Sequence, residues 1–246
     1  MLKSRFFLLF ACMTVAGTVS AQVRPGVKLG YNLGGVMGEY RGKPEDLKNT
    51  NGGDPGNFHM KSGFQVGLVA DCPVNEAIAI QPGARFSMQG FTDKYHSGAV
   101  TGDEVTRKFS LFYLQVPVYA QYRLNVAEDV NILFQAGPYV GAGLFGRQSI
   151  ISKKTKLTDD KHKKITFGND NSKDIYNAID YGIGAGVGIE FFRFQFVVAY
   201  DFGLSTPLFN KDAKSSTYNV DIRNHNLSVT LAVIFGRRDP LQNKKD

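Results

Sequence analysis

The sequence predicts an all-β protein, an eight-stranded antiparallel up-and-down transmembrane β-barrel. Three observations support this prediction: apolar and polar residues alternate along eight segments, long and short connections alternate between them, and aromatic residues stand at the ends of the apolar faces. A side-chain period of two is typical of a β-strand, because successive side chains point to opposite faces. Tight turns at one end and long loops at the other are the arrangement of outer-membrane barrels.

The N-terminus has the composition of a secretory signal peptide. Lys3 and Arg5 form a positive start, residues 6–15 are almost wholly apolar, and Ala21 ends a stretch suited to cleavage. A transmembrane anchor is disfavoured because the apolar run is too short to cross about 30 Å of hydrocarbon. Lipidation at Cys12 is a second alternative, but it would cut the apolar run short. Cleavage after Ala21 therefore predicts a mature chain that crosses the inner membrane.

The predicted organisation is a cleaved signal peptide at residues 1–21, an outer-membrane barrel at residues 22–236, and a short basic periplasmic tail at residues 237–246. The formal net charge is +7, and removal of the two bases Lys3 and Arg5 lowers it to +5. The mean hydropathy of −0.19 suits a barrel whose strands each carry one polar face. Two cysteines exclude a disulfide scaffold and a zinc site built mainly from cysteine.

The first half of the mature chain contains four predicted strands. In the first of them, Val27, Leu29 and Tyr31 lie on one face, and Lys28 and Gly30 lie on the other. The same alternation places the four strands at Val27–Leu33, Phe64–Ala70, Ile78–Met88 and Phe112–Tyr122.

The second half repeats the pattern with glycine on the polar face. Gly182, Gly184, Gly186 and Gly188 alternate with apolar residues along one strand. Glycine weakens an exposed strand, but on the inward face of a small barrel it makes room for other side chains. The four strands of this half are expected at Ile132–Ala142, Tyr181–Phe191, Phe194–Phe202 and Leu227–Phe235.

Short turns are predicted near residues 73–76, 125–129 and 192–193. An even number of strands puts both termini at the short-turn end, which is periplasmic in outer-membrane barrels. A soluble β-sandwich would show the same alternation, but the aromatic ends, the glycine-rich face and the signal peptide favour a membrane barrel. Because lipid leaves no backbone group unpaired, we expect the first strand to pair with the last. The long loops are expected at residues 36–62, 90–109, 145–179 and 204–224.

Five segments of the mature chain carry a family resemblance: Gly26–Leu33, Phe64–Gly67, Tyr113–Val118, Ala136–Tyr139 and Asp180–Glu190. In these segments, and in their order, the chain resembles the PorT-like, porin-family outer-membrane β-barrel proteins. The resemblance implies a barrel fold and an outer-membrane location. Some PorT-type members are similar to accessory parts of a protein-secretion and gliding apparatus, and no motif assigns this chain to that role.

Polar side chains on the inward faces are expected to meet inside the barrel. An eight-stranded barrel is just wide enough for side chains to fill it, and buried charges must be paired. We therefore expect a network of salt bridges and hydrogen bonds. The alternative is a narrow water or ion path, or a pocket for a small ligand. The predicted interior cluster consists of Lys28, Arg85, Tyr113, Gln115, Tyr119, Arg123, Glu190 and Asp201.

A run of lysines marks the third long loop. A solvated surface is the simplest explanation, and contact with anionic lipopolysaccharide or an acidic partner is the alternative. The four histidines of the chain show no metal-binding spacing, so neither a metal site nor a cofactor is predicted. The lysines proposed for anion contact are Lys153, Lys154, Lys156, Lys161, Lys163 and Lys164.

The predicted function is a structural, adhesive or envelope-machinery accessory role in the outer membrane, without enzymatic activity. A narrow pore or small-ligand carrier is the alternative, because the inward faces are polar and rich in glycine. A lipid-modifying barrel enzyme is a third hypothesis, although the sequence contains no GxSxG motif. The expected partners are outer-membrane lipid, including lipopolysaccharide, and an envelope protein. The chain is expected to be a monomer that binds no nucleic acid.

Overall fold

A computed structural model describes residues 23–41, 57–97, 103–152, 158–168, 176–205 and 219–236. The predicted signal peptide at residues 1–21 and the predicted tail at residues 237–246 lie outside the described residues. No helix in this part of the chain is long and apolar enough to cross a membrane.

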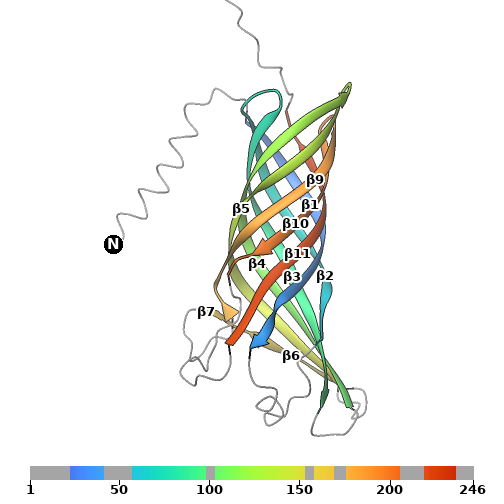
Figure 1. The fold of residues 1–246 in the computed structure, drawn as a ribbon, viewed down its shortest axis with the longest axis vertical. Coiled ribbons are helices and arrows are strands. Elements are labelled where there is room, and N and C mark those ends of the chain that lie inside the picture. Colours follow the sequence, from blue (N-terminus) through green and yellow to red (C-terminus); the bar gives the residue numbers. More distant parts are fainter. Residues whose placement is uncertain are drawn as a thin grey trace, which may run out of the picture.

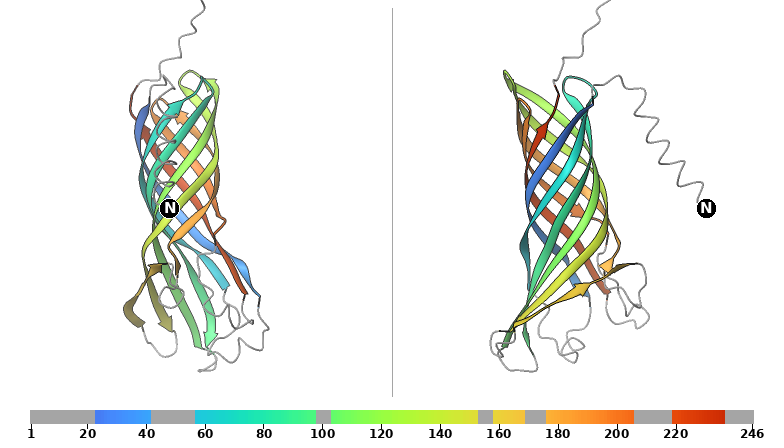
Figure 2. Two further views of the ribbon diagram at one scale, coloured as in Figure 1. Left: turned by 90° about the vertical axis from the view of Figure 1, so that its left-hand side faces the viewer. Right: turned by 180° about the vertical axis from the view of Figure 1, so that it is seen from behind.

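The described chain forms one tall barrel of antiparallel strands (Figures 1 and 2). The ring runs in the order β4-β3-β2-β1-β11-β10-β9-β5, and pairing of β5 with β4 closes it. The predicted eight-stranded up-and-down barrel is therefore confirmed. Its strands are β1 (Arg24–Arg41), β2 (Asn57–Pro73), β3 (Ile78–Ser97), β4 (Asp103–Ala127), β5 (Val130–Ser152), β9 (Ile179–Phe191), β10 (Phe194–Gly203) and β11 (Asn219–Ile234).

Three short strands lie outside the ring. β6 (Thr158–Ile165) pairs with the far end of β5, and β7 (Phe167–Gly168) pairs in parallel with β8 (Tyr176–Asn177). All three fall in a stretch predicted to be loop. They add hydrogen-bonded structure at the end of the barrel that is opposite the short turns (Figure 1).

The first and last strands pair as the barrel prediction requires. Their register runs from Gly26 opposite Ile234 to Arg41 opposite Asn219. The short turns occupy residues 74–77, 128–129 and 192–193, close to their predicted places. Each strand of the ring therefore has a hydrogen-bonded neighbour on both sides, so that no edge of the ring meets lipid.

The predicted long loops are wrong over much of their length, because the strands continue into them. β4 has 25 residues and β5 has 23, whereas a tilted strand crosses a membrane in about 9–11 residues. The strand pairing of β3 with β4 persists as far as Ser97 opposite Asp103. Beyond the lipid the strict alternation of polar and apolar residues is no longer required, although the backbones of neighbouring strands can still pair. The sequence pattern therefore ends before the strands do.

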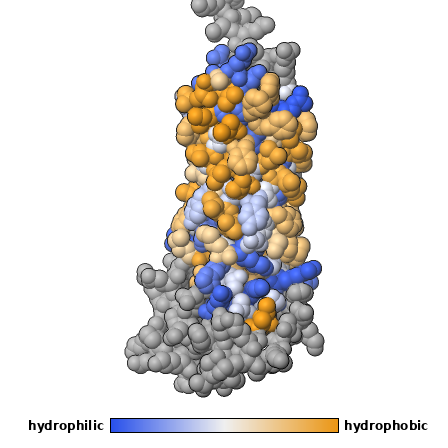
Figure 3. Space-filling view, turned by 90° about the vertical axis from the view of Figure 1, so that its right-hand side faces the viewer, coloured by the Kyte–Doolittle hydropathy of each residue, from blue (hydrophilic) through white to orange (hydrophobic). Residues whose placement is uncertain are grey.

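The two faces of the ring have the burial expected in a membrane rather than in a sandwich. Leu29 and Leu68 are 63% and 65% exposed, whereas Gln115 is 0% exposed. In a soluble sandwich the apolar face would be the buried one. Figure 3 shows a wide hydrophobic band on the face of the barrel that it draws, bordered by hydrophilic residues toward the loop end. The apolar face is the lipid-contacting surface.

A charge placed in the middle of this band should destabilise the barrel. Val116 is exposed and central on β4, so Val116→Arg is expected to cost about 2–4 kcal/mol of unfolding free energy in lipid. The matched change Val74→Arg, in an exposed turn, should cost about 0–1 kcal/mol. Urea unfolding in lipid vesicles, followed by heat-modifiable gel mobility, measures both. Equal losses would contradict the assignment of the band to the bilayer.

Candidate functional site in the barrel interior

The interior nearest the short turns contains an ion-pair network. Arg123 donates from Nη2 to Asp71 Oδ1 at 2.5 Å and from Nε to Glu190 Oε2 at 3.3 Å. Arg24 Nη2 lies 2.5 Å from Asp71 Oδ2. All four side chains are almost completely buried. Because they come from β1, β2, β4 and β9, the network ties four of the eight strands together.

Buried amides extend this network up the barrel. Gln195 Nε2 donates to Glu190 Oε2 at 2.7 Å, and Gln81 Nε2 donates to Gln195 Oε1 at 3.2 Å. Lys28 Nζ in turn donates to Gln81 Oε1 at 3.3 Å. β3 and β10, which carry Gln81 and Gln195, lie on opposite sides of the ring. The lumen is therefore bridged from wall to wall at this level.

The middle of the barrel is bridged by a second ion pair. Arg85 Nη2 on β3 lies 2.6 Å from Asp201 Oδ2 on β10, and Arg85 Nε donates to Gln115 Oε1 at 2.9 Å. Tyr119 donates its hydroxyl hydrogen to Asp201 Oδ1 at 3.0 Å. The guanidinium of Arg85 also lies over the ring of Tyr139, with Cζ 5.7 Å from the ring centroid. Arg85 is thus held by charge, hydrogen bonds and a cation–π contact.

Glycines on β9 provide the space for this central group. A Cβ atom at Gly184 would lie 2.4 Å from Asp201 Oδ1 and 2.8 Å from the Tyr119 hydroxyl. A Cβ atom at Gly182 would lie 2.8 Å from the Tyr139 hydroxyl. These inward glycines therefore leave space for the side chains of Tyr119 and Tyr139, as the sequence predicts for glycine on the inward face.

A third polar group lies nearer the loop end. Asp180 Oδ1 accepts hydrogen bonds from Ser205 Oγ at 2.8 Å and from Asn224 Nδ2 at 3.4 Å. Asn224 Nδ2 also lies 3.4 Å from the hydroxyl of Tyr113. β4 and β11, which carry Tyr113 and Asn224, are again on opposite sides of the ring.

An apolar cluster lies at the loop end of the interior. Phe91 stacks on Phe109 with ring centroids 4.5 Å apart, and Phe167 meets Tyr113 edge to face at 5.6 Å. A Cβ atom at Gly143 would lie 2.2 Å from the ring of Phe167, so the ring can pack here only because residue 143 has no side chain. The buried members of this apolar cap are Val36, Phe91, Leu111, Tyr113 and Ile165, with Phe58, Phe109 and Phe167 packed against them.

The structure places all eight residues of the predicted interior cluster inside the barrel. Arg123 and Glu190 lie in the network near the turns, and Tyr113 lies at the cap. Arg85 and Asp201 form the central pair, and Gln115 and Tyr119 hydrogen-bond to it. Lys28 donates to Gln81 in the network that adjoins this pair. The predicted strand limits stop just short of four further interior residues, Arg24, Asp71, Asp180 and Asn224. Extending the alternation by one residue would have found Asp71 and Asp180, and extending it by three would have found Arg24 and Asn224.

The lysine run is described only in part. Lys153, Lys154 and Lys156 lie outside the described residues, and Lys161 and Lys163 belong to β6 with side chains that are also outside the description. Lys164, near the end of β6, is exposed. Within the described ranges, no three His, Cys, Asp or Glu side chains are grouped to hold a metal ion.

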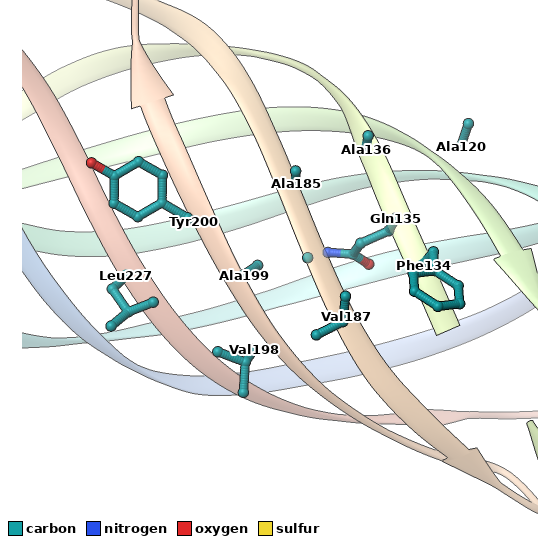
Figure 4. Close-up of a pocket in the computed structure, with 11 residues that line it drawn as sticks. Ala120, Phe134, Gln135, Ala136, Ala185, Val187, Val198, Ala199, Tyr200 and Leu227 are labelled. Atoms are coloured by element: carbon teal, nitrogen blue, oxygen red, sulfur yellow. The ribbon is translucent and has the colours of Figure 1, made fainter. Parts of the chain in front are cut away.

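A shallow groove on the outer wall is unrelated to this interior (Figure 4). Its floor is made by small residues that include Ala120, Ala136 and Ala185, and Phe134 and Tyr200 border it. These side chains belong to the lipid-facing side of the strands. The groove is therefore part of the bilayer contact surface.

Removal of one partner of the central ion pair should be costly. Asp201→Asn leaves the buried Arg85 guanidinium without its counter-charge, and the expected loss is about 3–5 kcal/mol of unfolding free energy. The double variant Arg85→Gln/Asp201→Asn should lose less than this single variant, because no uncompensated charge remains. Urea unfolding in lipid vesicles compares them. A double variant less stable than Asp201→Asn would contradict this account of the pair.

The match to a family model agrees with this architecture. Residues 19–210 match the family model described as outer membrane protein beta-barrel domain. A search of curated proteins finds no match. Among solved structures, the chain is similar to Ail, the attachment invasion locus protein of Yersinia pestis, with 11% identity and a TM-score of 0.39 over 87% of this chain and 99% of Ail.

Two further solved structures have comparable similarity. Neisserial surface protein A is 11% identical, with a TM-score of 0.41 over 86% of this chain and 97% of that protein. OprG from Pseudomonas aeruginosa is 8% identical, with a TM-score of 0.44 over 87% of this chain and 97% of OprG. The family match covers more than half of the sequence and agrees with the closed ring, the apolar outer band and the polar interior. The chain belongs to the outer membrane protein beta-barrel domain family.

Proposed function

We propose that this protein is a closed, non-conducting outer-membrane barrel that anchors a projecting β-surface for binding. The observation that carries the proposal is the bridging of the lumen between opposite strands, combined with the apolar cap at the loop end. In this role the protein is structural, adhesive or accessory to an envelope machine, and it acts by binding rather than by catalysis.

Cross-barrel contacts occur at three heights. Gln81 meets Gln195, Arg85 meets Asp201, and Asn224 meets Tyr113, each pair joining strands that face one another across the ring. An ion moving along the lumen would have to displace these side chains and leave buried charges unpaired, which is unfavourable. The apolar cap adds a barrier, because a narrow hydrophobic constriction excludes water. These features support a closed barrel.

The projecting surface follows from unequal strand lengths. β10 has 10 residues and β9 has 13, close to what a membrane crossing needs, while β3 has 20 and β4 has 25. The excess length of β3, β4 and β5, with β6 added to it, stands beyond the barrel at the loop end (Figure 2). We place this end outside the cell and the short turns and termini in the periplasm. An envelope protein or another cell-surface ligand would then meet the strand extensions.

A monomer suits this architecture because the ring closes without a second copy. The secretion-apparatus role of some PorT-type proteins is one specific form of the accessory role. It would use the same projecting strands as its contact surface.

Buried polar atoms with no described hydrogen-bond partner favour a second candidate function, a small-ligand carrier. The side-chain amides of Gln65 and Asn226 and the carbonyl of Asn32 are buried and have no hydrogen-bond partner among the described residues. Gln65 and Asn226 lie on β2 and β11, on either side of Asn32 on β1. A small polar molecule or ordered water would satisfy them. Ligand release on Gln65→Leu, measured by mass spectrometry of the native protein, would support this candidate.

Planar-bilayer recording tests the closed barrel. The purified protein should give no steady current, because the ion pairs and the apolar cap block the lumen. Arg85→Ala/Phe91→Ala removes one element of each barrier and should raise the frequency of channel openings, provided that the variant keeps its heat-modifiable gel mobility. A steady single-channel conductance of the unaltered protein would refute the proposal and favour the narrow-pore alternative.

A further inference from the structure

A belt of aromatic side chains marks one boundary of the apolar band. Phe64 and Phe86 have ring centroids 6.2 Å apart, and Phe86 and Phe112 are 5.8 Å apart. Phe112 stacks on Phe145 at 4.5 Å. Tyr31 extends the belt onto β1, where it stands opposite Phe64. Aromatic side chains gather where lipid tails meet headgroups, so the belt locates this interface across β1–β5.

A lysine lies directly beyond the belt, held against the barrel wall. Lys61 is adjacent to Ser62, whose Oγ is 2.6 Å from the hydroxyl of Tyr31. The β-bulge between Met60 and Gln65 occurs at this point of β2. Lys61 Nζ donates to the carbonyl oxygen of Phe109 at 3.2 Å and to the Ser110 hydroxyl. The side chain therefore reaches across β3 to β4 at the level of Ser110.

The strand register gathers three more cations around Ser110. Ser110 is opposite Arg147, and Arg147 is opposite Lys164. The side chains of Ser110, Arg147 and Lys164 therefore lie on the same face of the sheet, in one row across three strands. That face is the outer one, since Ser110 and Arg147 each stand two residues from the belt residues Phe112 and Phe145. Lys108 shares this face one row farther from the belt, and it is close enough to Lys61 to interact with it electrostatically.

These four cations, Lys61, Lys108, Arg147 and Lys164, form a basic patch. Lys108, Arg147 and Lys164 are exposed. None of the four makes an ion pair with a described residue. The nearby acid Asp93 is paired in register with Arg107, and both share the inward face with Phe91 and Phe109. The patch therefore has positive charge without a described counter-charge on its own face.

We propose that the basic patch binds the phosphate groups of an outer-leaflet glycolipid, with the acyl chains of that lipid against the aromatic belt. Lysine and arginine side chains bind phosphate through charge-assisted hydrogen bonds. The aromatic belt supplies the apolar surface that a lipid, but not a free anion, requires. The inference rests on the proposed orientation, in which the loop end faces the outer leaflet. Its ligand class is that of lipopolysaccharide.

The patch shares Lys164 with the lysine run predicted from the sequence, and matched variants separate it from Lys153, Lys154 and Lys156 of that run. One triple variant carries Lys108→Gln, Arg147→Gln and Lys164→Gln. The control carries Lys153→Gln, Lys154→Gln and Lys156→Gln, and so removes the same charge. Binding of purified lipopolysaccharide to the full mature chain in neutral detergent is measured by thermophoresis. Heat-modifiable gel mobility confirms that each variant is folded.

The patch variant should bind lipopolysaccharide at least about tenfold more weakly than the unaltered protein, and the control variant should bind within about twofold of it. Dephosphorylated lipopolysaccharide should bind as weakly as the patch variant does. Inorganic phosphate alone should compete only at far higher concentration than the lipid.

Three results would overturn the inference: equal weakening in both variants, unchanged binding after dephosphorylation, or inorganic phosphate that binds as tightly as the lipid. The first would indicate attraction by overall charge rather than a site at the patch, and the last would indicate a free-anion site. Channel recording is independent of all three, so failure here is distinguishable from failure of the closed-barrel proposal.

Discussion

Closure of the backbone hydrogen-bond ladder is the constraint on which the rest of this structure depends. Hydrocarbon offers no hydrogen-bond partner for a free N–H or C=O group, so the last strand of the sheet must pair with the first. β1 pairs with β11 in this way from Gly26 to Arg41. A ring of only eight strands then encloses a lumen about as wide as the side chains that point into it. Close packing of the interior is therefore a consequence of closure and strand number.

The narrow lumen determines which inward residues are compatible with one another. Large side chains such as Tyr119 and Tyr139 fit only because Gly184 and Gly182 face them. A buried charge fits only with a counter-charge or with hydrogen bonds to neutral groups, such as those of Lys28 and Asp180. Arg85 and Asp201 meet this condition across the full width of the ring. The same pairing that satisfies the charges also braces opposite walls, which is how a polar interior can belong to a closed barrel.

The strand number, order and inward face were predictable because lipid on one side and a polar lumen on the other impose a strict period of two. Outside the membrane that period relaxes, and the predicted strand ends fail there, as at Ser97 and Asp103. The apolar cap was unpredictable for a different reason: Phe167 comes from a segment without periodicity, and only its three-dimensional contact with Tyr113 reveals its role. Arg24 and Asp71 were missed at strand ends, although their parity agrees with the pattern.

The outer surface is asymmetric for a reason that begins in strand length. β9 and β10 end near the membrane boundary, whereas β3, β4 and β5 continue beyond it. Once a strand leaves the lipid, its outward positions no longer need to be apolar, and the first such positions are those next to the belt. Ser110 and Arg147 occupy them, and the bulge on β2 adds Lys61. The basic patch therefore stands where polar groups first become tolerable on the outer wall, which is also the depth at which lipid phosphates lie.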